Sequence, residues 1–356
     1  MSTADWQQIL PVVVFLLAIT ALAEVAAVAG LFDVVGHVAV RLAGGRVWLM
    51  WLVTFVAGCV ATTVLSLDAT AVLFTPVVIA MARQAGTSPI PFVLTTVWVA
   101  NTGSLLLPVS NLSNLLALRH FEQWGGAGGY LSVAWRPALM AMAATALVLV
   151  LLHRRELTGR YRVAEPPVVN DRVLLWCSAV LCVSLVPVVL AGVNPAIPAT
   201  VAALVGIGVL AWRARERLRE IVVPWRMALA VLVVFVAIRL LAHAGALDWL
   251  TTAAGHGTDT VSRLRLAGVG AFAANAVNNL PGYLLLEPAA TDSAHRMMAL
   301  LVGVNAGPLI TPWASLATLL WWQRCRRAGV TVSRKSFALQ GCVVAVVTVV
   351  AAAVVI

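Results

Sequence analysis

Uncharged polar side chains that could bind a small solute gather in two stretches of an otherwise apolar sequence. The first, residues 101–116, reads NTGSLLLPVSNLSNLL, and the second, residues 305–320, reads NAGPLITPWASLATLL. Asn, Ser and Thr side chains donate and accept hydrogen bonds without carrying charge. Glycine and proline in the same stretches interrupt a helix, which frees backbone carbonyl and amide groups at depth in the membrane. We therefore expect one polar binding site built from both stretches.

The two stretches align with each other as copies of one motif. Asn, Gly, Pro and four Leu residues coincide, at seven of sixteen positions. The predicted substrate-binding residues in these stretches are Asn101, Thr102, Ser104, Ser110, Asn111, Asn114, Asn305, Gly307, Thr311, Ser315 and Thr318. For any single one of these residues, a structural hydrogen bond between helices is an equally good explanation.

Two long apolar elements are interrupted near their middle. Residues 47–83 carry the sequence SLDAT, and residues 262–290 carry NAVNNLPG. Each interruption predicts a helical hairpin whose tip lies at depth in the membrane. The amides of the second tip, Asn278 and Asn279, join the predicted substrate-binding residues.

Acidic residues are rare in the apolar elements, where a carboxylate is costly unless it is paired or hydrated. Glu24, Asp68 and Glu287 lie there. Asp68 occupies the first hairpin tip, where we expect it to take up a coupling proton or to coordinate a cation. Glu24 is the second candidate for proton coupling. For Glu24 and Glu287, structural pairing with Asn or Arg is the stronger interpretation.

The composition predicts an integral membrane protein. Of 356 residues, 62% are hydrophobic and 11% are charged, with a mean hydropathy of +0.97. A soluble protein carries roughly 45–50% apolar and about 25% charged residues. The net charge of +10 comes mainly from short loops, so we expect contact with a lipid bilayer and none with nucleic acid. Five cysteines without metal-ligand spacing predict neither a metal site nor a cofactor.

The predicted fold is an all-α polytopic membrane protein with inverted-topology repeats. It has about eight transmembrane spans plus two helical hairpins, and two helices are unwound at mid-membrane. The predicted units are a first repeat at 1–155 (hairpin 47–83, broken helix 89–118), a cytoplasmic connection and two linking scaffold helices at 156–224, and a second repeat at 225–356 (hairpin 262–290, broken helix 296–322). The other spans are expected at 8–31, 131–152, 172–192, 195–212, 225–246 and 336–356.

The basic residues favour one orientation of these spans. With the N-terminus outside, eighteen Lys and Arg residues lie in the cytoplasmic connections and six in the opposite ones. This asymmetry follows the positive-inside rule. We therefore expect a multi-pass protein of the cytoplasmic (inner) membrane with both termini outside.

Four motifs resemble those of the arsenite/antimonite efflux permeases of the ion transporter superfamily. They are SLDATAVLFTPVVIAMA (66–82), NTGSLLLPVSNLSNLLAL (101–118), NAVNNLPG (275–282) and GVNAGPLITPWASLATLLWW (303–322). The resemblance implies a scaffold and a mobile transport domain made of two hairpins and two unwound helices. It also implies export of trivalent arsenic and antimony hydroxides in exchange for protons, by alternating access.

The resemblance extends to single residues and to partners. The motif positions of the family fall on Asp68, Ser110, Asn111, Asn114, Asn278, Asn279, Pro281, Gly303, Asn305, Gly307 and Pro308. Leu67 stands where the family usually has Asn, and Ala314 where it usually has Gly. Two further scaffold helices usually precede the region where this sequence begins. The implied partners are arsenite or antimonite, protons, a second copy in a homodimer and, in some members, a soluble ATPase.

Other functions are left open by the residues themselves. Sodium/proton exchange fits Asp68 because a carboxylate with backbone carbonyls can bind a cation. Carriers of dicarboxylate, sulfate or other anions fit less well, because a carboxylate in the site repels an anion. A permease subunit energised by an ATPase, and a channel, are further alternatives. We find no metalloprotease, hydrolase or nucleotide-binding motif and do not expect an enzyme.

Overall fold

Helices account for the fold of this chain throughout the part that the structure describes. The computed structural model describes residues 3–163, 165–190, 193–245 and 248–356. Within these ranges no β-strand is formed, and only an isolated bridge joins Arg46 to Arg160. Seven of the described helices are long and apolar enough to cross a membrane. The prediction of an all-α polytopic membrane protein is therefore confirmed.

The first series of elements begins with a hairpin and contains a broken helix. Helices α3 (Val47–Val64) and α4 (Leu67–Gln84) form the hairpin. Helix α5 (Ile90–Gly103) then ends, and the chain resumes as a helix only at α6 (Leu112–Phe121), before the long helix α7 (Gly126–His153). The short 3-10 helices η1 (Pro108–Ser110) and η2 (Glu122–Trp124) lie in this series.

The second series has the same order of elements. Helices α12 (Thr260–Val277) and α13 (Asn279–Leu286) form its hairpin, followed by η4 (Glu287–Ala290). The broken helix consists of α14 (Ala294–Ala306) and α15 (Leu316–Arg327), and the long last helix is α16 (Arg334–Val354). Both hairpins and both interruptions thus lie where the sequence predicts them. The long helices α7 and α16 pack against each other and join the two series.

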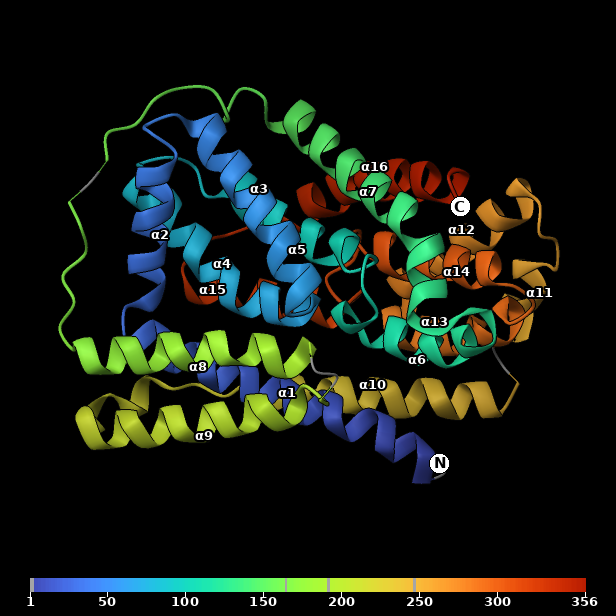
Figure 1. Cartoon of the computed structure of the whole chain (residues 1–356), viewed down its shortest axis with the longest axis horizontal. Coiled ribbons are helices and arrows are strands. Elements are labelled where there is room, and N and C mark those ends of the chain that lie inside the picture. The colour runs from blue at the N-terminus through green and yellow to red at the C-terminus, as the bar shows by residue number, and fades with distance from the viewer. Residues whose placement is uncertain (1–2, 164, 191–192, 246–247) are drawn as a thin grey trace.

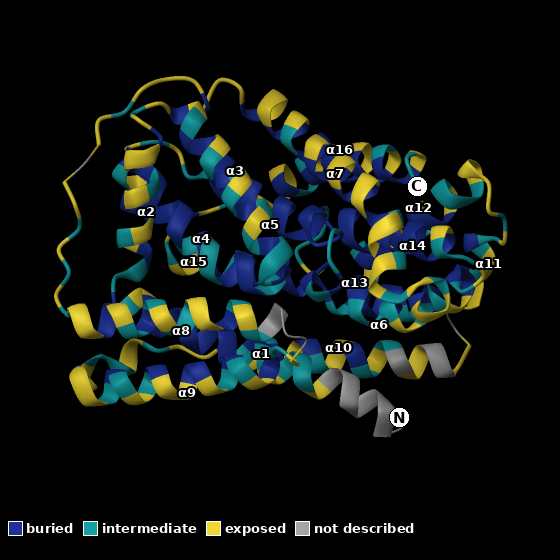
Figure 2. Ribbon diagram, in the orientation of Figure 1, coloured by how far each residue is buried: buried dark blue, intermediate teal, exposed yellow. Residues whose placement is uncertain are grey.

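Four further helices lie together along one side of the molecule, at the lower edge of Figure 1. They are α1 (Thr3–Val28), α8 (Arg172–Leu190), α9 (Ala196–Arg213) and α10 (Trp225–His243), and α1 packs against the other three. At the start of α8, Asp171 accepts a hydrogen bond from Arg213 at 2.9 Å, and the guanidinium holds the pKa of that carboxyl below its usual range. Many apolar side chains on the outer faces of the long helices are exposed, and lipid would cover them. Figure 2 marks the exposed positions along these helices in yellow.

One helix was missed by the hydropathy pattern, which leaves the residues between 31 and 47 in a loop. Helix α2 (Leu31–Leu42) occupies most of this region. Asp33 and Arg41 lower the local hydropathy, but the helix is amphipathic and buries Phe32 and Val40 on its inner face. The elements η3 (Arg215–Glu220) and α11 (Asp248–Ala254) were also expected as loop.

Small residues let the helices of the second series approach closely. A Cβ atom on Gly303 of α14 would lie 2.3 Å from the carbonyl oxygen of Ala267 in α12. A Cβ atom on Gly341 of α16 would lie 1.9 Å from the carbonyl oxygen of Leu309. No side chain fits at either position, which is the usual mode of close helix packing in membranes.

Arg296, at the start of α14, links this helix to η4 and to the segment between α11 and α12. The side chain is wholly buried. Its guanidinium donates to the carbonyl oxygen of Ala289 at 2.6 Å and to that of Gly255 at 2.6 Å, and it also donates to Gly257. The nearest carboxylate, that of Asp292, is 3.9 Å away and mostly exposed.

We expect Arg296→Met to destabilise the protein, because the buried carbonyl group of Ala289 and the half-buried ones of Gly255 and Gly257 lose their donor. A buried polar group left without a partner costs about 1–3 kcal/mol. Arg265→Met is the matched control, since Arg265 also donates to backbone carbonyls but is exposed to solvent that can replace it. Thermal unfolding of both purified variants in detergent measures the difference. Equal losses of stability would show that burial of Arg296 is not decisive.

Candidate functional site

The two hairpin tips adopt the same unusual backbone conformation. Among the described residues, Ser66 (φ 146°) and Asn278 (φ 96°) are the only ones besides glycine with positive φ. Each side chain caps the helix that follows: Ser66 Oγ accepts from the amide of Ala69 at 3.2 Å, and Asn278 Oδ1 accepts from that of Leu280 at 3.4 Å. Capping compensates for a conformation that L-residues rarely adopt.

The first broken helix is closed by its own amide and hydroxyl side chains. Asn114 Nδ2 donates to the carbonyl oxygens of Ser104 at 2.7 Å and Leu107 at 3.2 Å, both in the segment that follows α5. Ser110 Oγ donates to the carbonyl of Thr63 at 2.8 Å and ties the break to the first hairpin. Asn111 Oδ1 accepts from an amide in the first turn of α6 and caps that helix.

The second break is held by a residue that the site prediction left out, Asn275 of α12. Its Oδ1 accepts from the amides of Ile310 at 3.0 Å and Thr311 at 3.2 Å, and its Nδ2 donates to Gly307 O at 2.7 Å. Thr311 Oγ1 donates to the carbonyl of Asn275 at 2.8 Å. Asn275 begins the polar sequence NAVNNLPG, one helical turn before the tip, and this position was the available signal.

The second hairpin tip is bound to the same break. Asn278 Nδ2 donates to the carbonyl oxygen of Trp313 at 2.9 Å, and the backbone N–H of Asn279 donates to the carbonyl oxygen of Ala314 at 2.8 Å. The tip and the unwound segment therefore form one hydrogen-bonded unit.

Asn305 joins the two broken helices at the centre of the molecule. Its Oδ1 accepts from Asn111 Nδ2 at 2.7 Å and from Ser113 Oγ at 3.1 Å, while its Nδ2 donates to Asn114 Oδ1 at 2.6 Å. All four side chains are buried. The two stretches that the sequence singled out thus meet through their asparagines.

Several other predicted residues bond to their own helix or to each other. Asn101 Nδ2 donates to the carbonyl of Val97 at 2.8 Å, although its Oδ1 has no partner. Thr102 donates to the carbonyl of Trp98 at 2.9 Å. Ser104 donates to the carbonyl of Asn101 at 2.7 Å, and the hydroxyls of Ser315 and Thr318 lie 2.9 Å apart. These contacts have the character of structural hydrogen bonds.

Both hairpin tips border a cavity of about 360 Å³ next to the two broken helices that Asn305 joins by hydrogen bonds. Its polar lining consists of Ser66, Asp68, Asn111, Asn194, Asn278 and Asn279. The rest of the lining is apolar and includes Phe15 of α1 and Phe235 of α10. Asp68 lies in the first turn of α4, and its Oδ1 is buried without a hydrogen-bond partner.

The cavity collects four of the predicted site residues: Asp68, Asn111, Asn278 and Asn279. The predicted residues that do not line it are Asn101, Thr102, Ser104, Ser110, Asn114, Asn305, Gly307, Thr311, Ser315, Thr318 and Glu24. Over the part of the chain that the structure describes, no group of three or more His, Cys, Asp or Glu side chains could hold a metal ion.

Glu24 lies away from the cavity in a buried ion pair. Its carboxylate accepts from Arg324 and also contacts Arg327, both at the end of α15. Arg324 donates in addition to the carbonyl of Thr20 at 3.0 Å. The group joins α1 to the second broken helix.

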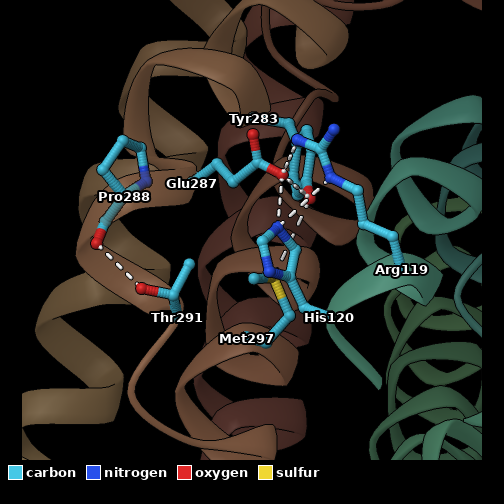
Figure 3. Close-up of polar contacts among 7 residues, drawn as sticks. All are labelled: Arg119, His120, Tyr283, Glu287, Pro288, Thr291 and Met297. Carbon is cyan, nitrogen blue, oxygen red and sulfur yellow. Dashed lines mark hydrogen bonds and ion pairs between the residues drawn. The ribbon is translucent and has the colours of Figure 1, made fainter. Parts of the chain in front are cut away.

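Glu287 is satisfied by three partners in a separate cluster, shown in Figure 3. Its Oε1 accepts from Arg119 Nη2 at 2.6 Å and from the hydroxyl of Tyr283 at 2.9 Å, and lies 2.8 Å from His120 Nε2. The cluster joins the end of α6 to the second hairpin, and Glu287 does not line the cavity.

Comparison with known proteins places the chain among membrane transporters. The sequence pattern of the citrate transporter family (CitMHS) matches residues 3–320. The chain belongs to this family. Membership of the citrate transporter family makes it a permease, in agreement with the expectation that it is not an enzyme.

Two curated relatives carry the name arsenical pump membrane protein. The one from Yersinia enterocolitica is 28% identical over 314 residues, which cover 81% of this chain and 72% of the relative. One from Escherichia coli is 27% identical over 318 residues, covering 82% and 73%. The resemblance drawn from the four motifs is thereby confirmed for this member of the citrate transporter family.

A solved structure shows a related fold. The crystal structure of the Alcanivorax borkumensis YdaH transporter, described as having an unusual topology, aligns with a TM-score of 0.50 at 19% identity. The alignment covers 99% of this chain and 85% of that protein. At this identity the likeness concerns the fold of the two transporters alone.

We expect Asn305→Ala to destabilise the protein by about 1–3 kcal/mol, because three buried polar groups of the first broken helix lose their partner on the second. Asn170→Ala, at an exposed position, is the control and should change stability by less than about 0.5 kcal/mol. Thermal unfolding in detergent provides the measurement. A variant as stable as the wild type would show that the crosslink does not hold the breaks together.

We expect Glu24→Gln to lower the stability strongly, by about 3–5 kcal/mol, because Arg324 would keep a buried charge without its partner. Transport by the protein that remains folded should be unchanged. Glu156→Gln is the control, since that carboxylate is 43% exposed. Normal stability combined with loss of transport would instead assign Glu24 to the transport mechanism.

Proposed function

We propose that this transporter exports arsenite and antimonite across the cytoplasmic membrane in exchange for protons, by alternating access. The observation that carries the proposal is the Asp68 carboxyl group, which borders the cavity between the two hairpin tips and has a buried oxygen without a partner. The names of the curated relatives support the choice of an arsenical as substrate.

Asp68 is the coupling group in this proposal. A carboxylate in a largely apolar cavity is costly when it is charged and unpaired, so proton uptake relieves a real penalty. The same oxygen atoms can accept hydrogen bonds from the hydroxyl groups of a substrate. Proton and substrate therefore compete for one group, which is the requirement for an exchanger.

The neighbouring groups suit a neutral hydroxylated solute. Arsenous acid is uncharged at neutral pH and offers three hydroxyl groups. Asn111, Asn278 and Asn279 line the same cavity. The side-chain amides of Asn111 and Asn278 already bond within the protein, whereas that of Asn279 forms no hydrogen bond to another described residue. The described lining contains no Lys, Arg or His that could neutralise an anion such as citrate, so an anionic substrate is disfavoured at this place.

In this proposal the other predicted residues position the site rather than touch the substrate. Asn114, Asn305 and Thr311 hold the unwound segments against which the tips are set. The two series of elements act as inverted repeats, at 1–155 and 225–356, with the linking helices between them. Both termini face outward in this proposal, and the proton gradient supplies the energy for the exchange.

Arsenite uptake into everted vesicles under an imposed proton gradient tests the proposal. Wild-type vesicles should accumulate arsenite, and a protonophore should abolish the accumulation. Asp68→Asn keeps the shape of the side chain but cannot exchange a proton, so accumulation should fall at least about tenfold. Asp33→Asn, at an exposed position on α2, is the matched control and should transport normally.

Three other outcomes would contradict parts of the proposal. Accumulation that survives Asp68→Asn would move the coupling group elsewhere. Accumulation that requires a sodium gradient or added ATPase would replace proton exchange by another energy source. No movement of arsenite, in vesicles that contain folded protein, would exclude arsenite as the substrate.

A further inference from the structure

The cavity is larger than arsenous acid requires. Arsenous acid consists of one arsenic atom and three hydroxyl groups, which together need on the order of 100 Å³ if each group is given the ~30 Å³ of a water molecule. The cavity holds about 360 Å³. Pockets that enclose organic ligands hold roughly 300–1,000 Å³. Most of the space is therefore unused by the proposed inorganic substrate.

The unused space has an apolar wall, and this wall comes from elements other than those that carry the polar groups. The polar groups come mainly from the hairpin tips and the start of α6. Helices α1 and α10, the start of α9 and the residue before it contribute Pro11, Phe15, Pro195, Ala196 and Phe235. Asn194 is the one polar side chain on this described wall.

Two phenylalanines belong to this wall, of which Phe15 is half-buried and Phe235 is buried. Phe15 and Phe235 both line the cavity, and within the described part of the chain neither ring stacks on another aromatic side chain. Aromatic rings pair favourably with one another beyond the burial of apolar area. An aryl group would complete a pairing that the protein leaves open.

Charge further restricts the ligand. Asp68 is the only titratable side chain in the described lining, and no cationic group faces it there. A ligand with an anionic head would meet a carboxyl group without compensation. A neutral head with hydroxyl groups can instead bond to Asp68 and the side-chain amide of Asn279.

These features together define a molecule with a small neutral dihydroxyl head and an apolar body. We propose that the transporter accepts trivalent organoarsenicals with an aromatic substituent, R–As(OH)2, and binds them more tightly than arsenite. The As(OH)2 head lies at the hairpin tips beside Asp68, and the ring lies against Phe15 and Phe235. This inference rests on the proposed function and specifies its substrate class.

The test compares phenylarsenite with arsenite in the same everted vesicles under a proton gradient. Vesicles without the protein provide the baseline for passive diffusion of phenylarsenite. The wild type should transport both compounds, with a KM for phenylarsenite about tenfold or more below that for arsenite, because burial of the ring adds apolar contact. Accumulation of phenylarsenite should collapse with a protonophore.

A variant whose cavity is partly filled by a larger side chain distinguishes transport of the two substrates. Ala196→Phe places a ring on the apolar wall and should raise the KM for phenylarsenite at least about tenfold, while arsenite transport stays within about twofold. Ile197→Phe places the same ring on an exposed face of α9 and should change neither. Arsenite uptake reports that each variant is folded, and Ala196→Leu replaces Ala196→Phe where that uptake is lost.

The results distinguish this inference from the function on which it rests. Transport of arsenite without phenylarsenite, or an equal response of both compounds to Ala196→Phe and Ala196→Leu, would overturn the organoarsenical proposal and leave arsenite export intact. If neither compound moves in vesicles that hold folded protein, both proposals fail.

Discussion

The structure depends on satisfying backbone polar groups where helices stop inside the membrane. Hydrocarbon offers no hydrogen bonds, so each carbonyl and amide freed by an interruption needs a partner within the protein. Side-chain amides supply these partners here. Asn114 satisfies the first break, Asn275 satisfies the second, and Asn305 ties the first break to the second broken helix. The polar residues in the apolar sequence are first a consequence of this requirement.

Such a network uses up the groups that it contains. Asn305 has both ends of its amide engaged, and Thr311 is bonded to Asn275 through its hydroxyl and its backbone amide. A group that serves a substrate must retain free bonding capacity and face open space. Asp68 retains bonding capacity, because its buried Oδ1 lacks a partner, and the residue lines the cavity. The distinction between support and site therefore follows from counting hydrogen bonds.

The sequence predicted where the helices are interrupted, but it did not predict which hydrogen bonds close the interruptions or where the cavity lies. Glycine, proline and polar residues within apolar runs are local signals, and they located both tips and both breaks. The cavity depends on which elements lie beside the tips, and α1 and α10 are distant in sequence from residue 68. Helix α2 was not predicted, because the mean hydropathy of an amphipathic helix is close to that of a polar loop. The role of Asn275 needed three-dimensional contacts, since nothing in its local sequence separates it from Asn278 and Asn279.

The cavity lies where two kinds of element meet, and this boundary constrains any alternating-access movement. Tips and breaks form one hydrogen-bonded unit, whereas the apolar wall belongs to α1, α10 and the α8–α9 connection. The Glu24–Arg324 pair crosses from α1 to α15. A movement of the hydrogen-bonded unit against α1 must either keep this pair together or admit water to it, because a buried charge without a partner is very costly. The movement therefore either turns about this ion pair or carries the free-energy cost of separating it.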